Sequence, residues 1–569
     1  MSKKVKRTFT ILIAVMIFTT LFSACAKKGD TGTQNDTSMG KTTESVDKEP
    51  TAFDKSKLLE ISWFGFSGVD IVEGNVLQKE LEEKFNVKIK NVKADIFNNE
   101  QINLMINSGE MPDCSFMYQN PRDLWDKGVT RAIPKNFIEK YSPDYNKLLN
   151  RHPIGWKLNL VPDKKDEYMA INGINLAGDG DGWVSHYRLD WLEEAGIKPK
   201  GELIKIDDGG HVFFTKTPFT LDEQEQIFDA FLKMNTDTKN PKYPASGNKD
   251  TTNYSWETIL NSFGVKTWMN LEEDGKYIQY YQSNKWKQAL KVLNNYYKKG
   301  YIDQEWTSQD LTKHWEKLNS SMVGWWPNFI SYVNTSYQDR PPFGLLAKAP
   351  DAKILITPPE IASDGDQYYC PSNPSPHNYN YPSYIGNNVD DEKLARILQM
   401  FNYICFDKEA QVKHLFGVEG KHFTWQGEPY NSGIDAIADV TPKEKGEYGI
   451  GFYRLVMYDE RIATYLTNEM QRPMINWIKA SNYKRIDNYK HDIFSELTEE
   501  YDKLGKQIGA DVNMIWQEFY MQAVIGEVNI DSEWDNYLKR LDDAGIEKRN
   551  AIGNKAPLFA PLLKGEVKY

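Results

Sequence analysis

Cys25 stands in a setting that would suit a chemically modified thiol. It ends the string LFSAC, in which the small residues Ser23 and Ala24 come directly before the cysteine. A peptidase that cleaves here must draw extended backbone into a narrow cleft, and small side chains allow this. Cleavage would make Cys25 the first residue of the mature chain, with its thiol available to carry lipid.

The residues before Cys25 have the pattern of an export signal. The first seven residues, MSKKVKR, carry four positive charges, and an apolar run follows from Thr8 to Phe22. This run is short for a membrane span and has the length of a signal-peptide core. With LFSAC it resembles the bacterial lipobox, although Phe22 stands where leucine is usual. We expect a signal peptide over 1–24 and diacylation of Cys25, which gives a stable anchor; an uncleaved N-terminal anchor is the alternative.

Residues 25–53 are expected to form a flexible tether. From Lys27 to Pro50 the chain is rich in Ser, Thr, Gly, Asp and Lys, with almost nothing apolar to bury. Such a composition does not offset the entropy cost of ordering the chain. A tether of this kind suits a folded body that lipid holds at the extracytoplasmic face of a cell membrane.

The rest of the chain has the composition of a soluble, acidic, multi-domain protein. Roughly 515 residues follow the tether, more than one hydrophobic core usually serves. The net charge is −11, and removing the signal peptide with its four positive charges takes it to −15. This charge argues against nucleic acid as a partner and against electrostatic docking on anionic lipid. No second apolar run approaches the length of a membrane span.

The remaining cysteines suggest no redox or metal chemistry. Cys114, Cys370 and Cys405 are odd in number and show neither a CxxC motif nor metal-ligand spacing. We therefore expect no disulfide framework, no metal and no cofactor. The aromatic content, 13% with 16 Trp and 32 Tyr, is the more unusual property. Sugar-binding clefts use such rings, because the apolar face of a pyranose stacks on them. Carbohydrate is therefore one candidate ligand class.

An α/β pattern opens the body of the chain. Strands are expected at Leu58–Phe64, at Val87–Ala94 and within MPDCSFMYQN, with the helices VLQKELEEKF and NNEQINLMINSGE between them. This alternation predicts a layer of parallel strands. Ligands of such sheets bind outside the carboxyl ends of the strands. Trp63 and Phe66 at the first strand, and Gln119 and Asn120 after the third, should therefore lie near one rim.

The later segments continue the same α/β class. Thr220 and Glu223 form a predicted capping box at the start of a helix. The other expected elements are a helix over Lys285–Asp303, strands over Ser321–Ile330 and Ala352–Pro359, a helix or helix pair over Asp390–Phe416, and a mostly helical region from Thr464 to Ala544.

Several strings, taken in order, resemble one known family. They are LEEKFNVKIK with NLMINSGEMPD, IPKNFIEKYSPDY, YRLDWLEEAGIK, PFTLDEQEQIFDAF, YYKKGYID and GVEGKHFTW. These strings span most of the mature chain and are similar to extracellular solute-binding proteins of ABC importers, family 1, in the LplA-like lipoprotein branch. The resemblance implies an α/β, type II periplasmic-binding-protein fold, with two lobes joined by a hinge and the ligand cleft between them. It places lobe one at 54–178 and 385–465, lobe two at 183–378, and C-terminal helices of both lobes at 466–569.

The resemblance also implies a function and partners. A carbohydrate, more specifically an oligosaccharide, would be bound by hinge closure and delivered to permease subunits in the membrane by a monomeric, lipid-anchored binder. The predicted ligand-binding residues are Trp63, Phe66, Gln119, Asn120, Trp183, Tyr187, Arg188, Asp190, Trp325, Trp326 and Trp425. Arg188 with Asp190 could instead form a structural contact at the hinge, and one of the neighbouring pair Trp325 and Trp326 should lie in the core, because successive strand residues face opposite sides.

Some members of the wider family bind calcium through a loop with oxygen ligands at alternating positions. In the corresponding stretch, Asn235 to Thr252, Asp237, Asn240 and Asp250 remain as oxygen ligands, but an insertion breaks the spacing. We therefore assign no metal site.

Two other classes of protein remain open from the sequence alone. A surface glycoside hydrolase or lyase would need two carboxylates at a set separation, which spacing along one sequence does not reveal. The sequence contains neither HExxH nor GxSxG, and GVEGKH lacks the first glycine and the hydroxyl residue of a phosphate loop. A sensor or adhesin could use the same binding fold. We expect a binder rather than an enzyme.

Overall fold

The computed structural model describes residues 56–558, apart from the gaps 67–69, 97, 110, 118, 152–154, 157–158, 175–180, 238–240, 250–253, 268, 336, 338, 371–376, 438–439, 454–459, 487–489, 491–496 and 557. The predicted signal peptide, Cys25 and the predicted tether lie outside these residues, as do Asn240 and Asp250. A search of the described helices finds none that is long and apolar enough to cross a membrane. The described chain forms two α/β lobes, each built on its own sheet.

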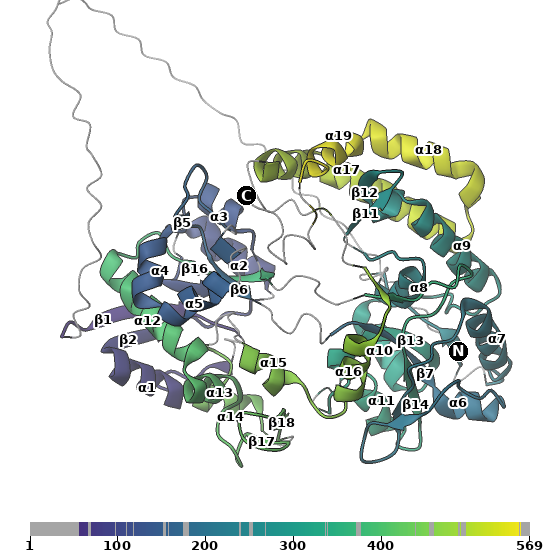
Figure 1. Cartoon of the computed structure of the whole chain (residues 1–569), viewed down its shortest axis with the longest axis horizontal. Helices are drawn as coiled ribbons and strands as arrows, with labels where there is room; N and C mark the ends of the chain where they lie inside the picture. Colours follow the sequence, from purple (N-terminus) through teal and green to yellow (C-terminus); the bar gives the residue numbers. More distant parts are fainter. Residues whose placement is uncertain are drawn as a thin grey trace, which may run out of the picture. The chain divides into compact units, whose positions relative to one another are not determined.

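Lobe one is built on a five-stranded mixed sheet of order β2-β1-β3-β16-β6. Its strands are β1 (Leu59–Phe64), β2 (Val87–Asn91), β3 (Cys114–Phe116), β6 (Ile171–Ile174) and β16 (His377–Ile385). β1 runs parallel to β2 and β3, as the sequence predicts, and β16 is antiparallel to both of its neighbours. β16 begins before the boundary at 385 that the sequence predicts, because this returning strand pairs with β3 on one side and β6 on the other. Figure 1 shows the labels of β16 and β6 next to those of α4 and α5.

The other elements of lobe one cover this sheet. They are α1 (Val76–Phe85), α2 (Asn99–Ser108), α3 (Pro121–Asp126), β4 (Ile133–Pro134), α4 (Lys135–Tyr141), α5 (Pro143–Arg151), β5 (Glu167–Tyr168), α12 (Asp391–Phe406), α13 (Lys408–Phe416), β17 (Phe423–Trp425), β18 (Ile434–Ala436), α14 (Pro442–Tyr448) and α15 (Glu460–Leu466). α1 begins where the Asn75 side chain accepts a hydrogen bond from the backbone N–H of Gln78 at 2.9 Å. Apolar side chains of α1, α12 and the strands, such as Leu77, Leu398 and Ile61, form one core.

Lobe two is built on a six-stranded sheet of order β10-β13-β7-β14-β9-β8. Its strands are β7 (Trp183–Arg188), β8 (Ile204–Lys205), β9 (Val212–Phe214), β10 (Tyr243–Ala245), β13 (Val323–Phe329) and β14 (Ile354–Thr357). β13 is parallel to β10, β14 is parallel to β9, and β7 is antiparallel to both β13 and β14. The strands predicted within Ser321–Ile330 and Ala352–Pro359 are confirmed.

Helices and short strands surround the sheet of lobe two. They are α6 (Leu189–Glu194), α7 (Leu221–Lys233), η3 (Tyr254–Trp256), α8 (Glu257–Ser262), β11 (Asn270–Glu273), β12 (Lys276–Gln279), η4 (Tyr280–Gln282), α9 (Asn284–Lys298), α10 (Leu311–Asn319), η5 (Ile330–Tyr332), α11 (Phe343–Lys348), β15 (Tyr368–Tyr369), α16 (Arg472–Ala480), β19 (Lys484–Arg485), α17 (Leu497–Ile525), α18 (Ile530–Asp543) and α19 (Ile546–Gly553). The predicted capping box is confirmed at α7, where Thr220 and Glu223 satisfy each other's backbone N–H groups. α17, α18 and α19 pack with α9 in the core of lobe two.

Three chain segments pass between the lobes, from β6 to β7, from β15 to β16 and from α15 to α16. The first two are hydrogen-bonded to each other where they meet lobe two. The backbone N–H of Trp183 donates to the carbonyl of Cys370 at 3.1 Å, and the Tyr369 hydroxyl donates to the carbonyl of Asp181 at 3.0 Å. A side chain at Gly182 would meet the Tyr369 ring at 2.4 Å, so this close approach requires glycine. The β6–β7 and β15–β16 segments are therefore held together where they meet lobe two.

Candidate ligand-binding site

The lobe-two sheet has an edge at which most of its strands finish. β9, β10, β13 and β14 end there, and β7 begins there because it runs in the opposite direction. The register confirms this arrangement, since Phe329 at the end of β13 pairs with Trp183 at the start of β7. Sheets of this kind bind ligands outside the carboxyl ends of their strands. We call this side of the sheet the carboxyl edge.

Four aromatic rings gather at the carboxyl edge of lobe two, and we call them the aromatic edge: Trp183, Tyr254, Phe329 and Tyr332. The Trp183 ring lies 4.1 Å from Phe329 and 5.2 Å from Tyr254, measured between centroids, and the ring of Tyr332 lies 5.9 Å from that of Phe329. Trp183 is buried, whereas the other three rings are half-buried. Partly open rings with supporting rings behind them can stack on the apolar face of a sugar.

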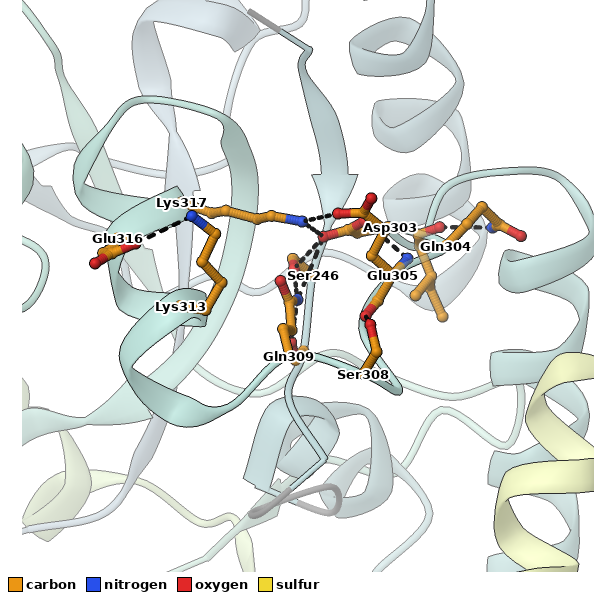
Figure 2. A network of polar contacts seen from close by, with 11 residues as sticks. Ser246, Asp303, Gln304, Glu305, Ser308, Gln309, Lys313, Glu316 and Lys317 are labelled. Carbon is orange, nitrogen blue, oxygen red and sulfur yellow. Dashed lines mark hydrogen bonds and ion pairs between the residues drawn. The ribbon is translucent and has the colours of Figure 1, made fainter. Parts of the chain in front are cut away.

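The residues directly after β10 belong to a buried polar network (Figure 2). The ammonium of Lys317, on α10, lies 2.6 Å from the Asp303 carboxylate, and neither side chain is exposed by more than 6%. Ser246, directly after β10, donates to the same carboxylate at 3.0 Å. Gln309 donates to Ser246 at 2.8 Å and also to the carbonyl of Gly247. Ser246 and Gly247, at the end of β10, are thus attached to a buried charge pair.

A second buried carboxylate lies at the start of α8, close to Tyr254 in the sequence. Glu257 opens α8, three residues after Tyr254, and is completely buried. It accepts hydrogen bonds from the Thr267 hydroxyl at 2.8 Å and the Asn261 amide at 3.3 Å. Burial disfavours the carboxylate and raises the pKa of Glu257 to about 7, against the opposing effect of these donors and of Lys266. Glu257 therefore anchors the start of the helix that follows Tyr254.

Several residues that the sequence predicts as ligand contacts in lobe two instead lie beneath the aromatic edge. Tyr187 and Trp325 are fully buried, and both donate to one oxygen of Glu360, at 2.6 and 3.2 Å. Ser185 and Gln224 donate to the same oxygen. Burial raises the pKa of the Glu360 carboxyl. Tyr187 and Trp325 therefore support the sheet rather than line its surface, which corrects the prediction of direct contact.

Trp326, Arg188 and Asp190 are also placed away from the aromatic edge. Trp326 is buried on the opposite face of the sheet from Trp325, with its ring stacked on His186 at 5.3 Å. Arg188 ends β7, about 16 Å along the strand from Trp183. Its guanidinium lies 2.8 and 2.5 Å from the two oxygens of Asp190 at the start of α6. The pair makes a structural contact, but at the opposite end of β7 from the segments that connect the lobes, so it is not the contact at the hinge that the sequence left open as an alternative.

In lobe one, three predicted contact residues meet at one edge of the sheet. Phe66 follows β1 and packs on Phe116, the last residue of β3, at 5.8 Å. Gln119 and Asn120 follow β3; Gln119 is half-buried, and Asn120 is exposed and caps α3 through the Arg122 N–H at 2.8 Å. Because β1 and β3 are parallel, these residues share the carboxyl edge of lobe one.

Trp63 and Trp425, the remaining predicted contacts in lobe one, lie elsewhere. Trp63 is fully buried within β1, edge-on to Tyr453 at 5.9 Å, and belongs to the core. Trp425 is half-buried in β17 and packs on Tyr430 and Tyr465 in the small core of its own hairpin. The structure therefore retains Trp183, Phe66, Gln119 and Asn120 at carboxyl edges. It adds Tyr254, Phe329 and Tyr332. Phe329 and Tyr332 lie at or just after the end of the strand predicted over Ser321–Ile330, which was the available signal, whereas no predicted strand comes before Tyr254.

Comparison with known proteins agrees with this arrangement. The fold is that of the extracytoplasmic solute-binding proteins of ABC importers, so the resemblance predicted from the sequence is confirmed, while the LplA-like branch stays a prediction. The chain is 23% identical over 512 residues to the fructooligosaccharide ABC transporter substrate-binding protein FusA of Streptococcus pneumoniae, covering 84% of this chain and 86% of that protein. No family model matches the chain.

Two solved structures extend the comparison. FusA of Streptococcus pneumoniae in complex with kestose superposes with a TM-score of 0.66 at 18% identity, over 88% of this chain and 98% of that one. An HMO-binding, ABC-transporter-associated solute-binding protein from Bifidobacterium longum infantis gives a TM-score of 0.65 at 16% identity, over 90% and 99%. Both likenesses establish the shared fold.

Proposed function

We propose that this protein is the solute-binding component of an ABC importer and that it captures an oligosaccharide. The aromatic edge is the observation that carries the proposal, because it offers stacking surfaces at the edge where this class of sheet binds ligands. The names of the relatives support the ligand class, since one is described as a fructooligosaccharide binder and another as HMO-binding.

Binding would act through hinge closure. A ligand that touches the carboxyl edges of both lobes gains its full contacts only when the lobes close, so it shifts the population toward the closed state. Trp183, Tyr254, Phe329 and Tyr332 would serve as contacts in lobe two. Phe66, Gln119 and Asn120 would serve in lobe one. The permease would then recognise the closed form, and a separate subunit would hydrolyse ATP.

We also propose that the protein does not alter its ligand chemically. One experiment tests both the binding and the absence of turnover. Calorimetry with fructo-, xylo- and malto-oligosaccharides should reveal saturable binding of at least one series to the purified chain. Incubation with the same sugars should release no new reducing ends. Turnover would favour the glycoside hydrolase or lyase reading, and a lack of binding by all series would contradict an oligosaccharide ligand. The relatives are binding proteins of transporters, which supports a binder.

We further propose that the protein works as a monomer anchored to the outer face of the cell membrane by lipid on Cys25. The support is the string LFSAC behind a charged and apolar leader. Replacing Cys25 with serine should abolish incorporation of labelled palmitate and shift the protein from the membrane fraction to the medium or to an unprocessed precursor. Unchanged labelling in the variant would show that the lipid is attached elsewhere.

A further inference from the structure

A cavity of about 850 Å³ lies beside α16, and none of the residues of the aromatic edge lines it. Its lining includes two aromatic residues, Trp477 and Tyr483, whose ring centroids are 4.8 Å apart. Polar side chains complete the wall, among them Arg472, Glu469 and Asn476. Its volume falls in the range of cavities that hold small-molecule ligands. Rings beside amide and bidentate charged groups are the combination that recognises a sugar, with its apolar face and its adjacent hydroxyls.

The cavity lies along the carboxyl edge of lobe two. Two of its lining residues fix this: Lys216 follows the end of β9, and Ile204 pairs with Phe214, the last residue of that strand. The Tyr483 hydroxyl donates to the carbonyl of Lys216 at 3.4 Å, which ties the segment after α16 to the same place. In the sheet, β9 is two strands away from β7, the strand that begins with Trp183. Two strand spacings are about 10 Å.

Hydrogen bonds join the wall of the cavity to the aromatic edge. Gln471, directly before α16, donates to the carbonyl of Ser331 at 3.2 Å, next to Tyr332. Ser331 in turn donates to both oxygens of Asp181, two residues before Trp183, at 2.9 and 3.0 Å. Neighbours of both surfaces are therefore joined by hydrogen bonds, which favours a constant spacing between the cavity and the aromatic edge.

The polar groups of the cavity are already oriented. The Arg472 guanidinium donates to both oxygens of Glu469 at 2.9 and 2.7 Å, one helical turn away. Such a fork leaves further N–H groups and oxygen lone pairs for a ligand. Asn476, one turn further along α16, is exposed and carries both a donor and an acceptor. This mixture of donors and acceptors suits hydroxyl groups, each of which both donates and accepts.

We propose that this cavity is an extension subsite that binds the sugar units at one end of an oligosaccharide whose other units stack on the aromatic edge. The inference rests on the proposed function and deepens it, because it assigns a chain-length preference to the protein. Short ligands are held by the aromatic edge alone. Longer ligands gain additional contacts with Tyr483, Arg472 and Asn476, so their affinity rises with the number of units.

The test measures dissociation constants for a ladder of two to six units from the oligosaccharide series that the wild-type chain binds best. Tyr483→Ala should leave the affinity for the shortest bound sugar within about twofold and weaken that for the longest by about tenfold, which corresponds to one lost aromatic contact. Asn476→Ala, which removes an exposed side chain, should act in the same direction. Lys479→Ala, on the same helix but outside the lining, serves as the matched control and should change neither affinity.

The possible outcomes distinguish the extension subsite from the oligosaccharide-binding function on which it rests. Equal losses for all lengths, or none in either variant, would overturn the extension subsite while the protein remained an oligosaccharide binder. Failure of the wild-type chain to bind any series would instead overturn the proposed function, and the subsite with it. The thermal midpoint of each variant distinguishes a loss of folding, which would weaken all ligands together, from a loss of the subsite.

Discussion

Replacing Phe329 with alanine should weaken oligosaccharide binding by about 2 kcal/mol, or roughly thirtyfold in Kd. The ring is half-buried at the end of β13 and packs on Trp183 at 4.1 Å and on Tyr332 at 5.9 Å. Its removal takes away a stacking surface and also a support of Trp183. Calorimetry with the best-bound sugar, for wild type and variant in parallel, measures the effect.

Phe213→Ala is the matched control for this prediction. Phe213 is also half-buried and lies in a strand of the same sheet, but it is in the middle of β9 rather than at the carboxyl edge. Both substitutions remove a partly buried phenylalanine ring and should lower the free energy of unfolding to a similar extent. We expect only Phe329→Ala to lose affinity. Equal affinity of the two variants for the sugar would mean that the aromatic edge is not the binding surface.

Much of the fold can be predicted from local patterns in the sequence. The first strand begins at Leu59, one residue from its predicted start, because apolar residues alternate with Glu60 and Ser62 in the pattern of a half-covered strand. Thr220 and Glu223 form the predicted capping box because its two hydrogen bonds involve residues only three apart. The order of family-like strings was enough to predict the two-lobed fold. These features depend on neighbours along the chain.

Other features depend on partners that are distant in the sequence, and there the predictions were less accurate. β16 starts at His377, since its place between β3 and β6 is set by strands some two hundred residues earlier and not by its own composition. Trp325 and Trp326 are both core residues, because helices cover both faces of the lobe-two sheet and leave neither side of β13 open. Alternation along a strand predicts opposite faces but does not reveal which of them is covered.

The site residues were misjudged for the same reason. Trp63 sits at a strand end, as a ligand contact should, yet Tyr453 from a distant segment of lobe one covers its ring. Glu360, which binds Tyr187 and Trp325, is separated from both in sequence and carries no local motif. Phe329 gave the same signal as Trp63, an aromatic ring at a strand end, and it remained partly open. Whether a ring at such a position is exposed depends on the tertiary structure.

The second large effect that we expect concerns stability rather than affinity, and it follows from substitution in the polar network of Figure 2. Lys317→Met should lower the free energy of unfolding by about 3 kcal/mol, because it leaves the Asp303 carboxylate buried without its counter-charge. Methionine keeps most of the packing of the lysine stem, so the loss reports on the charge. Urea unfolding of the purified chain, followed by tryptophan fluorescence, measures it.

Two further variants identify the cause of this loss. Lys313→Met removes a lysine from the same helix. Its ammonium lies 3.1 Å from the carboxylate of Glu316, but both side chains are more than half exposed. We therefore expect the free energy of unfolding to change by less than about 0.5 kcal/mol. Combining Lys317→Met with Asp303→Asn removes both charges while the asparagine oxygen can still accept from Ser246 and Gln309. The double variant should therefore recover most of the stability that the single variant loses. If it is instead less stable than Lys317→Met, the uncompensated charge is not the source of the loss, and the two substitutions must act through packing.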